Sequence, residues 1–111
     1  MSEWTDFPET PALNTLVRDV LSGALPELPA PCPACGVTAL HAYMHMRGPG
    51  RMGGFWIWCT YCRNFAHGTA TFVSWWHDLP AVDAAGLTAT PAALVELSKQ
   101  IDQHWNSLRQ G

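Results

Sequence analysis

The 111-residue chain lacks several features that would place it in a common class of protein. No stretch approaches the ~18 apolar residues that a membrane-spanning helix needs. Its first residues are acidic, with neither a basic start nor an apolar run, so no targeting signal is visible. We therefore expect a cytoplasmic protein without a membrane partner, in which paired cysteines are more often metal ligands than disulfides.

Acidic residues are missing from the middle of the chain. No Asp or Glu occurs between residues 31 and 77, and three arginines give this segment a charge of +3: Arg47, Arg51 and Arg63. The flanks carry nine acidic residues against three basic ones, which makes the net charge -3. General nucleic-acid binders have a clear basic excess, so the charge argues against that class and leaves only a local site open.

Motifs for catalysis are also scarce. The sequence has no nucleophile–base motif, no phosphate-binding loop and no pair of carboxylates near its centre. Residues 31–35 match half of a zinc deaminase motif, but no His-x-Glu triplet supplies the remaining ligand and the proton shuttle. A redox Cys-x-x-Cys pair usually starts a helix after a strand, and Gly36 with the alternation beyond it favours another structure. We expect a protein that is not an enzyme.

What the sequence does contain is two helix patterns that flank a β pattern. Thr10 is a typical N-cap before a proline, an apolar stripe at helical spacing follows, and Gly23 is a typical stop. The same start signal recurs at residues 90–91 before a second stripe. These patterns predict helices over 10–23 and 90–110. Aspartate at Leu16 or Ile101 should therefore unfold the chain, whereas Arg51→Ala should not.

The segment between the helices has the pattern of β structure. Residues 38–46 alternate at the period of a strand, residues 48–54 form a glycine-rich turn, and residues 55–59 form an aromatic strand. We expect a single α+β domain over residues 1–111. Its β core, residues 31–78, is predicted to be a small antiparallel sheet with an N-terminal and a C-terminal helix packed on it.

All four cysteines belong to two CxxC units: Cys32, Cys35, Cys59 and Cys62. Zn²⁺ prefers four ligands in a tetrahedron, and two CxxC turns can supply them. The 23 residues between the units fit a hairpin that brings both turns to the same place. Four cysteines leave no position for water, so the site is expected to be structural. We predict one structural Zn²⁺, with iron as the alternative occupant of the same sulfurs.

This pattern, over residues 31–68, resembles the zinc-ribbon and rubredoxin-like class of small metal domains. Rubredoxins usually carry CPxCG at both units, whereas here Gly36 follows the first unit and Arg63 follows the second. That departure makes an electron-transfer iron site the less expected one. The resemblance implies a metal-stabilised β core and no particular function.

Tryptophan is unusually common, with six residues in the chain. Packing in the core is their default role, but we do not expect so small a domain to bury all six. Exposed tryptophan beside arginine is typical of protein-binding hot spots and of platforms for single-stranded nucleic acid. The candidate partner contacts are Arg51, Trp56, Trp58, Arg63, Trp75 and Asp78. The five histidines are expected to be partly exposed, with an auxiliary role near the metal left open for His67.

Residues 54–67, with their aromatic strand and second CxxC unit, and the following Trp75-Trp76 pair, resemble small bacterial immunity partners of secreted toxins. The resemblance implies that the chain neutralises a cognate toxin by covering its active or substrate site. The acidic flanks would suit a basic toxin surface. The alternative is a zinc ribbon that binds nucleic acid or works with the transcription machinery, for which the three arginines would supply the phosphate contacts.

Overall fold

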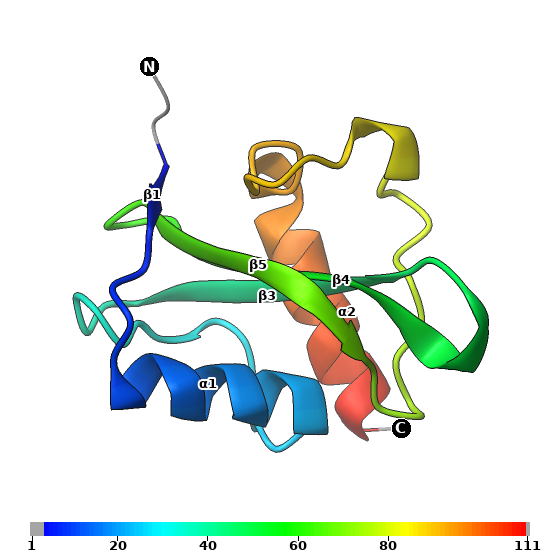
Figure 1. The fold of residues 1–111 in the computed structure, drawn as a ribbon, viewed down its shortest axis with the longest axis horizontal. Helices are drawn as coiled ribbons and strands as arrows, with labels where there is room; N and C mark the ends of the chain where they lie inside the picture. The colour runs from blue at the N-terminus through cyan, green and yellow to red at the C-terminus, as the bar shows by residue number, and fades with distance from the viewer. Residues whose placement is uncertain (1–3, 111) are drawn as a thin grey trace.

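The structure, a computed structural model, describes residues 4–110 (Figure 1). A five-stranded sheet with the order β1-β5-β4-β3-β2 forms its centre. The strands are β1 (Thr5–Asp6), β2 (Ala30–Pro31), β3 (Thr38–Met46), β4 (Met52–Cys59) and β5 (Asn64–Thr71). The helices are α1 (Pro11–Ser22) and α2 (Ser98–Gln110), with 3₁₀ turns at Pro49–Arg51, Ala84–Gly86 and Val95–Leu97.

The sheet is mixed, so the expectation of a purely antiparallel sheet is wrong. Strands β2 to β5 pair in antiparallel fashion, with Trp56 opposite Tyr43 on one side and His67 on the other. Strand β1, however, runs parallel to β5, with Thr5 opposite Asn64. A two-residue strand has no periodicity that a sequence pattern can reveal, and its pairing arises only because the N-terminal chain returns to the edge of β5.

Both predicted helices are present, and the first one starts and stops where the sequence predicts. Thr10 Oγ1 accepts a hydrogen bond from the Leu13 N–H at 3.1 Å, and Gly23 has a left-handed φ of 76°. The second helix begins at Ser98 and not near residue 90, because residues 91–97 form a series of tight turns that bury Leu94. Neither described helix is long and apolar enough to cross a membrane.

Both faces of the central strands are covered. In Figure 1, α2 passes behind the strands and α1 runs below them. Alternation along β4 puts Trp56 and Trp58 on one face, where their indole N–H groups donate to the Thr88 carbonyl at 2.7 Å and to Ser98 Oγ at 3.3 Å. The opposite face and the buried side of α1 belong to the same apolar core: Leu13, Leu16, Val20, Leu40, Ala42, Met44, Phe55 and Ile57.

This double coverage corrects the prediction made for the tryptophans. Five of the six are buried, including Trp56 at 1% and Trp58 at 0% exposed. Trp56 and Trp58 therefore have the default role in the core and are not exposed, although they were also candidate partner contacts. Trp75 is half-buried and meets the Trp105 ring edge-on, with the centroids 5.1 Å apart. Strand alternation placed Trp56 and Trp58 together on one face, but only the tertiary structure shows that α2 and residues 72–97 cover that face.

Candidate metal centre

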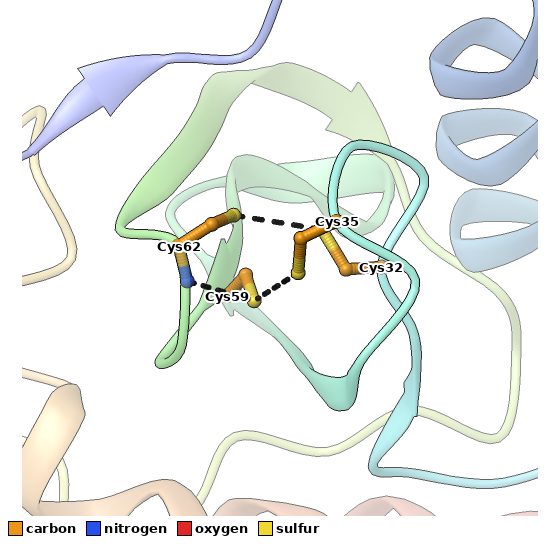
Figure 2. Close-up of side chains that lie close together, drawn as sticks. All are labelled: Cys32, Cys35, Cys59 and Cys62. Carbon is orange, nitrogen blue, oxygen red and sulfur yellow. Dashed lines mark hydrogen bonds between the residues drawn. The ribbon is translucent and has the colours of Figure 1, made fainter.

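The four cysteines converge from two turns at one end of the sheet. The first unit lies between β2 and β3, and the second lies between β4 and β5. Because Leu40 pairs with Cys59, the β3–β4 hairpin brings the two turns side by side, as the spacing predicts. Figure 2 shows the four side chains turned toward one another, and their sulfur atoms all lie within 4.8 Å of each other.

The sulfur geometry fits a tetrahedral metal ion. Cys32 Sγ lies 3.7 Å from Cys62 Sγ, and Cys35 Sγ lies 3.7 Å from Cys59 Sγ. A tetrahedron of sulfurs at ~2.3 Å from a central ion has edges of about 3.8 Å. These separations are far longer than a disulfide bond of about 2.05 Å, and all four thiols are free. A metal held this way has four protein ligands, which is the arrangement of structural sites.

The two turns share a backbone conformation despite their different sequences. The residue after each CxxC unit is left-handed: Gly36 has a φ of 79° and Arg63 a φ of 64°. The Ala34 N–H donates to Cys32 Sγ at 3.3 Å, and the Cys62 N–H donates to Cys59 Sγ at 3.5 Å. Arg63 therefore keeps the geometry that the missing second glycine would have favoured, at a conformational cost of roughly 1 kcal/mol.

The environment of each sulfur decides which thiol most readily forms a thiolate. Burial raises the pKa of Cys59 to about 12 and also raises the pKa of Cys32. The Val37 backbone N–H lowers the pKa of the exposed Cys35. In the metal-free chain the buried thiols are therefore protonated near neutral pH, and an entering metal ion has to displace their protons.

Two of the predicted partner contacts hold the chain's own backbone. Arg51, at a left-handed φ of 62°, donates to the Val73 carbonyl from Nε at 3.1 Å and from Nη2 at 2.7 Å, and also to the Trp76 carbonyl. Asp78 Oδ1 accepts the Met46 N–H at 3.0 Å. This guanidinium ties the chain after β5 to the hairpin, so Arg51→Ala is expected to lower stability, while the prediction that it does not unfold the chain stays a prediction.

Arg63, the other arginine among the predicted contacts, also contacts a residue of this chain. The guanidinium carbon of Arg63 lies 5.0 Å from the ring centroid of Trp4, at cation–π distance. The backbone of Arg63 takes part in the same junction, because its carbonyl accepts the Thr5 N–H at 3.0 Å. Arg63 therefore attaches the N-terminal chain to the second cysteine turn.

A buried contact between a histidine and an aspartate was not predicted from the sequence. His41 Nδ1 lies 2.7 Å from Asp102 Oδ1, and both residues are buried. His41 Nε2 lies 3.5 Å from Thr60 Oγ1, so a carboxylate, an imidazole and a hydroxyl stand in the order found in hydrolase triads. His41 is only 7% and Asp102 only 8% exposed, and the pair joins β3 to α2 inside the fold. The expectation of partly exposed histidines is wrong here and fits His67 and His77.

The large apolar side chains that are exposed are not those of the predicted contacts. Tyr61 is 70% and Val37 is 37% exposed, one beside each cysteine turn, and Met52 is 49% exposed beside the hairpin tip. Residue type alone does not distinguish them from the core, because exposure depends on which segments cover each position. They were therefore beyond the reach of a sequence pattern.

One long edge of the sheet is closed by side chains. Strand β2 covers only the beginning of β3. Further along β3, the Met44 carbonyl accepts a hydrogen bond from Trp76 Nε1 at 2.8 Å, and the Met46 N–H donates to Asp78 at 3.0 Å. Residues 76–78 thus occupy backbone groups that a further strand would otherwise use.

Strand β5 forms the side of the opposite edge that follows β1. Because β1 has only two residues, it covers only the first residues of β5. The Phe65 carbonyl accepts the Phe7 N–H at 2.9 Å. Since alternate residues of a strand direct their backbone groups to the same side, those of His67, Thr69 and Thr71 point outward as well. Within residues 4–110, no hydrogen bond reaches these outward groups. We call these three residues the open β5 edge.

Comparison of the chain with protein-family models, with curated proteins and with solved structures gives no match.

Proposed function

We propose that this chain is a non-catalytic, zinc-stabilised cytoplasmic module that binds another protein, and that it does so through the open β5 edge. Two CxxC turns with sulfur separations of 3.7 Å support a closed four-thiolate zinc site, which has no free position for a substrate. The zinc holds together the end of the sheet at which β5 begins. The zinc site therefore stabilises the fold, and the open β5 edge binds the partner.

The difference between the two sheet edges carries the proposal of a protein partner. An edge strand with unpaired backbone groups is a template for another chain, and natural proteins usually block it. Here the β3 edge is blocked by Trp76 and Asp78, while the open β5 edge has no such protection within the described chain. Between residues 66 and 71 there is no lysine, no proline and no acidic residue. A partner that adds one extended segment would satisfy these groups.

A toxin is the partner we propose, and the support for it is the sequence pattern of residues 54–67 with the Trp75-Trp76 pair. An immunity protein neutralises its toxin by covering the active or substrate site. The acidic flanks favour a basic partner surface through complementary charge. Tyr61 and Val37, exposed in the two cysteine turns, provide further apolar surface for a partner.

A nucleic-acid partner has less support. Of the three arginines in the acid-free segment, Arg51 donates hydrogen bonds to the Val73 carbonyl. Within residues 4–110, the guanidinium groups of Arg47 and Arg63 take part in no ion pair, and each lies over a tryptophan ring. Because phosphate contacts dominate such affinity, two such arginines in a chain of net charge -3 favour the protein partner.

The test is a pull-down with the tagged, zinc-loaded protein, in parallel with Thr69→Pro and Thr69→Val, each with and without nuclease. Proline removes an outward N–H from the open β5 edge, where edge strands tolerate it. Valine keeps that N–H and the β-branched shape. We expect one stoichiometric, nuclease-resistant protein that Thr69→Val retains and Thr69→Pro loses, and that is toxic when expressed alone. Capture that disappears with nuclease, or that both variants retain, would contradict the proposal.

A further inference from the structure

A hollow opens beside the tip of the β3–β4 hairpin, at the end of the sheet opposite to the four cysteines. It has a volume of about 330 Å³. Its walls include Arg47, Met52, His67 and Thr69, and its floor includes Gly54, which has no side chain. Protein pockets for small ligands start at about 300 Å³. The hollow is therefore large enough for a ligand of roughly ten non-hydrogen atoms.

Arg47 gives this hollow a positive charge that no described acidic group neutralises. The ion pairs found within residues 4–110 join His41 to Asp102 and His45 to Asp78, and Arg47 takes part in neither. Its guanidinium carbon lies 5.9 Å from the ring centroid of the buried Trp56, at cation–π distance. A guanidinium with free N–H groups can hold a carboxylate by two parallel hydrogen bonds.

His67 forms a wall of the hollow in a fixed orientation. Its Nδ1 lies 3.0 Å from the Phe55 carbonyl oxygen, which can only accept, so Nδ1 carries the hydrogen. The ring stacks on Trp56 with the centroids 4.8 Å apart, which fixes its orientation.

The balance of these groups selects one class of ligand. The single cation Arg47 matches a singly charged acid, whereas a phosphate dianion needs several donors. Met52, 49% exposed, supplies an apolar wall beside the charge. We propose that the hollow binds a carboxylate carried on an apolar group, with the carboxylate on Arg47 and the apolar group against Met52. The hollow shares His67 and Thr69 with the open β5 edge, but it needs no paired partner strand in order to bind the carboxylate.

Two sources share this chemistry: a free aromatic carboxylic acid and the C-terminal residue of a polypeptide. The zinc-loaded, ¹⁵N-labelled protein is titrated with 3-phenylpropionate and, separately, with N-acetyl-alanyl-phenylalanine, followed by NMR. The matching uncharged amides of both compounds serve as controls. We expect saturable shifts of the Gly48, Gly53 and Gly54 amide signals with a Kd of about 0.1–10 mM. The amides should bind at least about tenfold more weakly, because they lack the charge.

The comparison of the two acids assigns the source. Tighter binding of the dipeptide indicates a polypeptide C-terminus, and equal or tighter binding of 3-phenylpropionate indicates a free acid. Arg47→Gln should weaken either by at least about tenfold, and Arg109→Gln, at an exposed position of α2, should have no effect. Thr69→Trp should abolish binding by filling the hollow. Circular dichroism and zinc content establish that each variant is folded.

The proposal would be overturned by the absence of saturable shifts up to about 20 mM acid. It would equally be overturned by amides that bind as well as acids, by unchanged affinity in Arg47→Gln, or by full affinity in folded Thr69→Trp.

Discussion

Replacing Cys59 by serine removes a member of the four-cysteine cluster that is fully buried, at 0% exposed. Structural zinc contributes ~10–16 kcal/mol in small zinc peptides, while the folding free energy of a whole domain is about 5–15 kcal/mol. The loss of one buried ligand therefore removes a term as large as the total stability. We expect Cys59→Ser to contain no zinc and to lack a cooperative thermal transition.

The exposed Cys35 gives a graded comparison within the same site. Solvent reaches this position, so a water molecule can replace the missing sulfur and leave a three-cysteine site with one open coordination position. At Cys59 no water can enter without opening the core. Cys35→Ser should therefore keep part of its zinc and a lowered but cooperative transition.

Zinc content measured by a colorimetric release assay, together with melting followed by circular dichroism, separates these outcomes. Chelator-treated wild-type protein should behave like Cys59→Ser. If the metal-free protein melted like the zinc-loaded wild-type protein, the structural role of the metal would be refuted. Equal damage from the two serine variants would refute the reasoning from burial.

Three further predictions follow from the same contacts. Arg51→Ala should lower the free energy of unfolding in urea by about 1.5–3 kcal/mol, because it leaves the Val73 and Trp76 carbonyls without their charged donor; an unchanged midpoint would contradict that role. Arg63→Gly should be more stable than Arg63→Ala by roughly 1 kcal/mol in the same assay. Both variants lose the contact with Trp4, but only glycine adopts a φ of 64° without strain. A more stable alanine variant would exclude backbone strain as the cause. Lowering the pH should weaken zinc binding by at least about tenfold per pH unit in a competition titration, because protons compete for thiols whose pKa burial has raised, to about 12 for Cys59; zinc affinity independent of pH would contradict thiolate ligation.

The convergence of the four cysteines was predictable because its signal is local. Two CxxC units fix two sulfurs each within a short turn, and the 23-residue separation leaves a hairpin as the simple way to unite them. The first helix was predictable for the same reason: Thr10 and Gly23 act within one turn of the helix ends. The start of α2 was not, because the turns at residues 91–97 depend on the burial of Leu94 against the rest of the chain.

The internal roles of three candidate partner contacts could not be predicted for a related reason. Trp56, Trp58 and Arg51 were selected by residue type, and type does not state whether a side chain is covered or already bonded. Arg51 reaches the Val73 and Trp76 carbonyls, more than twenty positions away in sequence. No local pattern contains such a contact.

By itself, the sequence determined the α+β class, the four-cysteine cluster and the approximate extent of α1, because periodicity, caps and CxxC spacing act over a few residues. The tertiary structure alone decided that β1 joins β5 in parallel, that both faces of β4 are covered, and that the β3 edge is blocked while the open β5 edge is not. These features depend on which distant segments return to the sheet, since burial and backbone pairing belong to surfaces brought together by the fold.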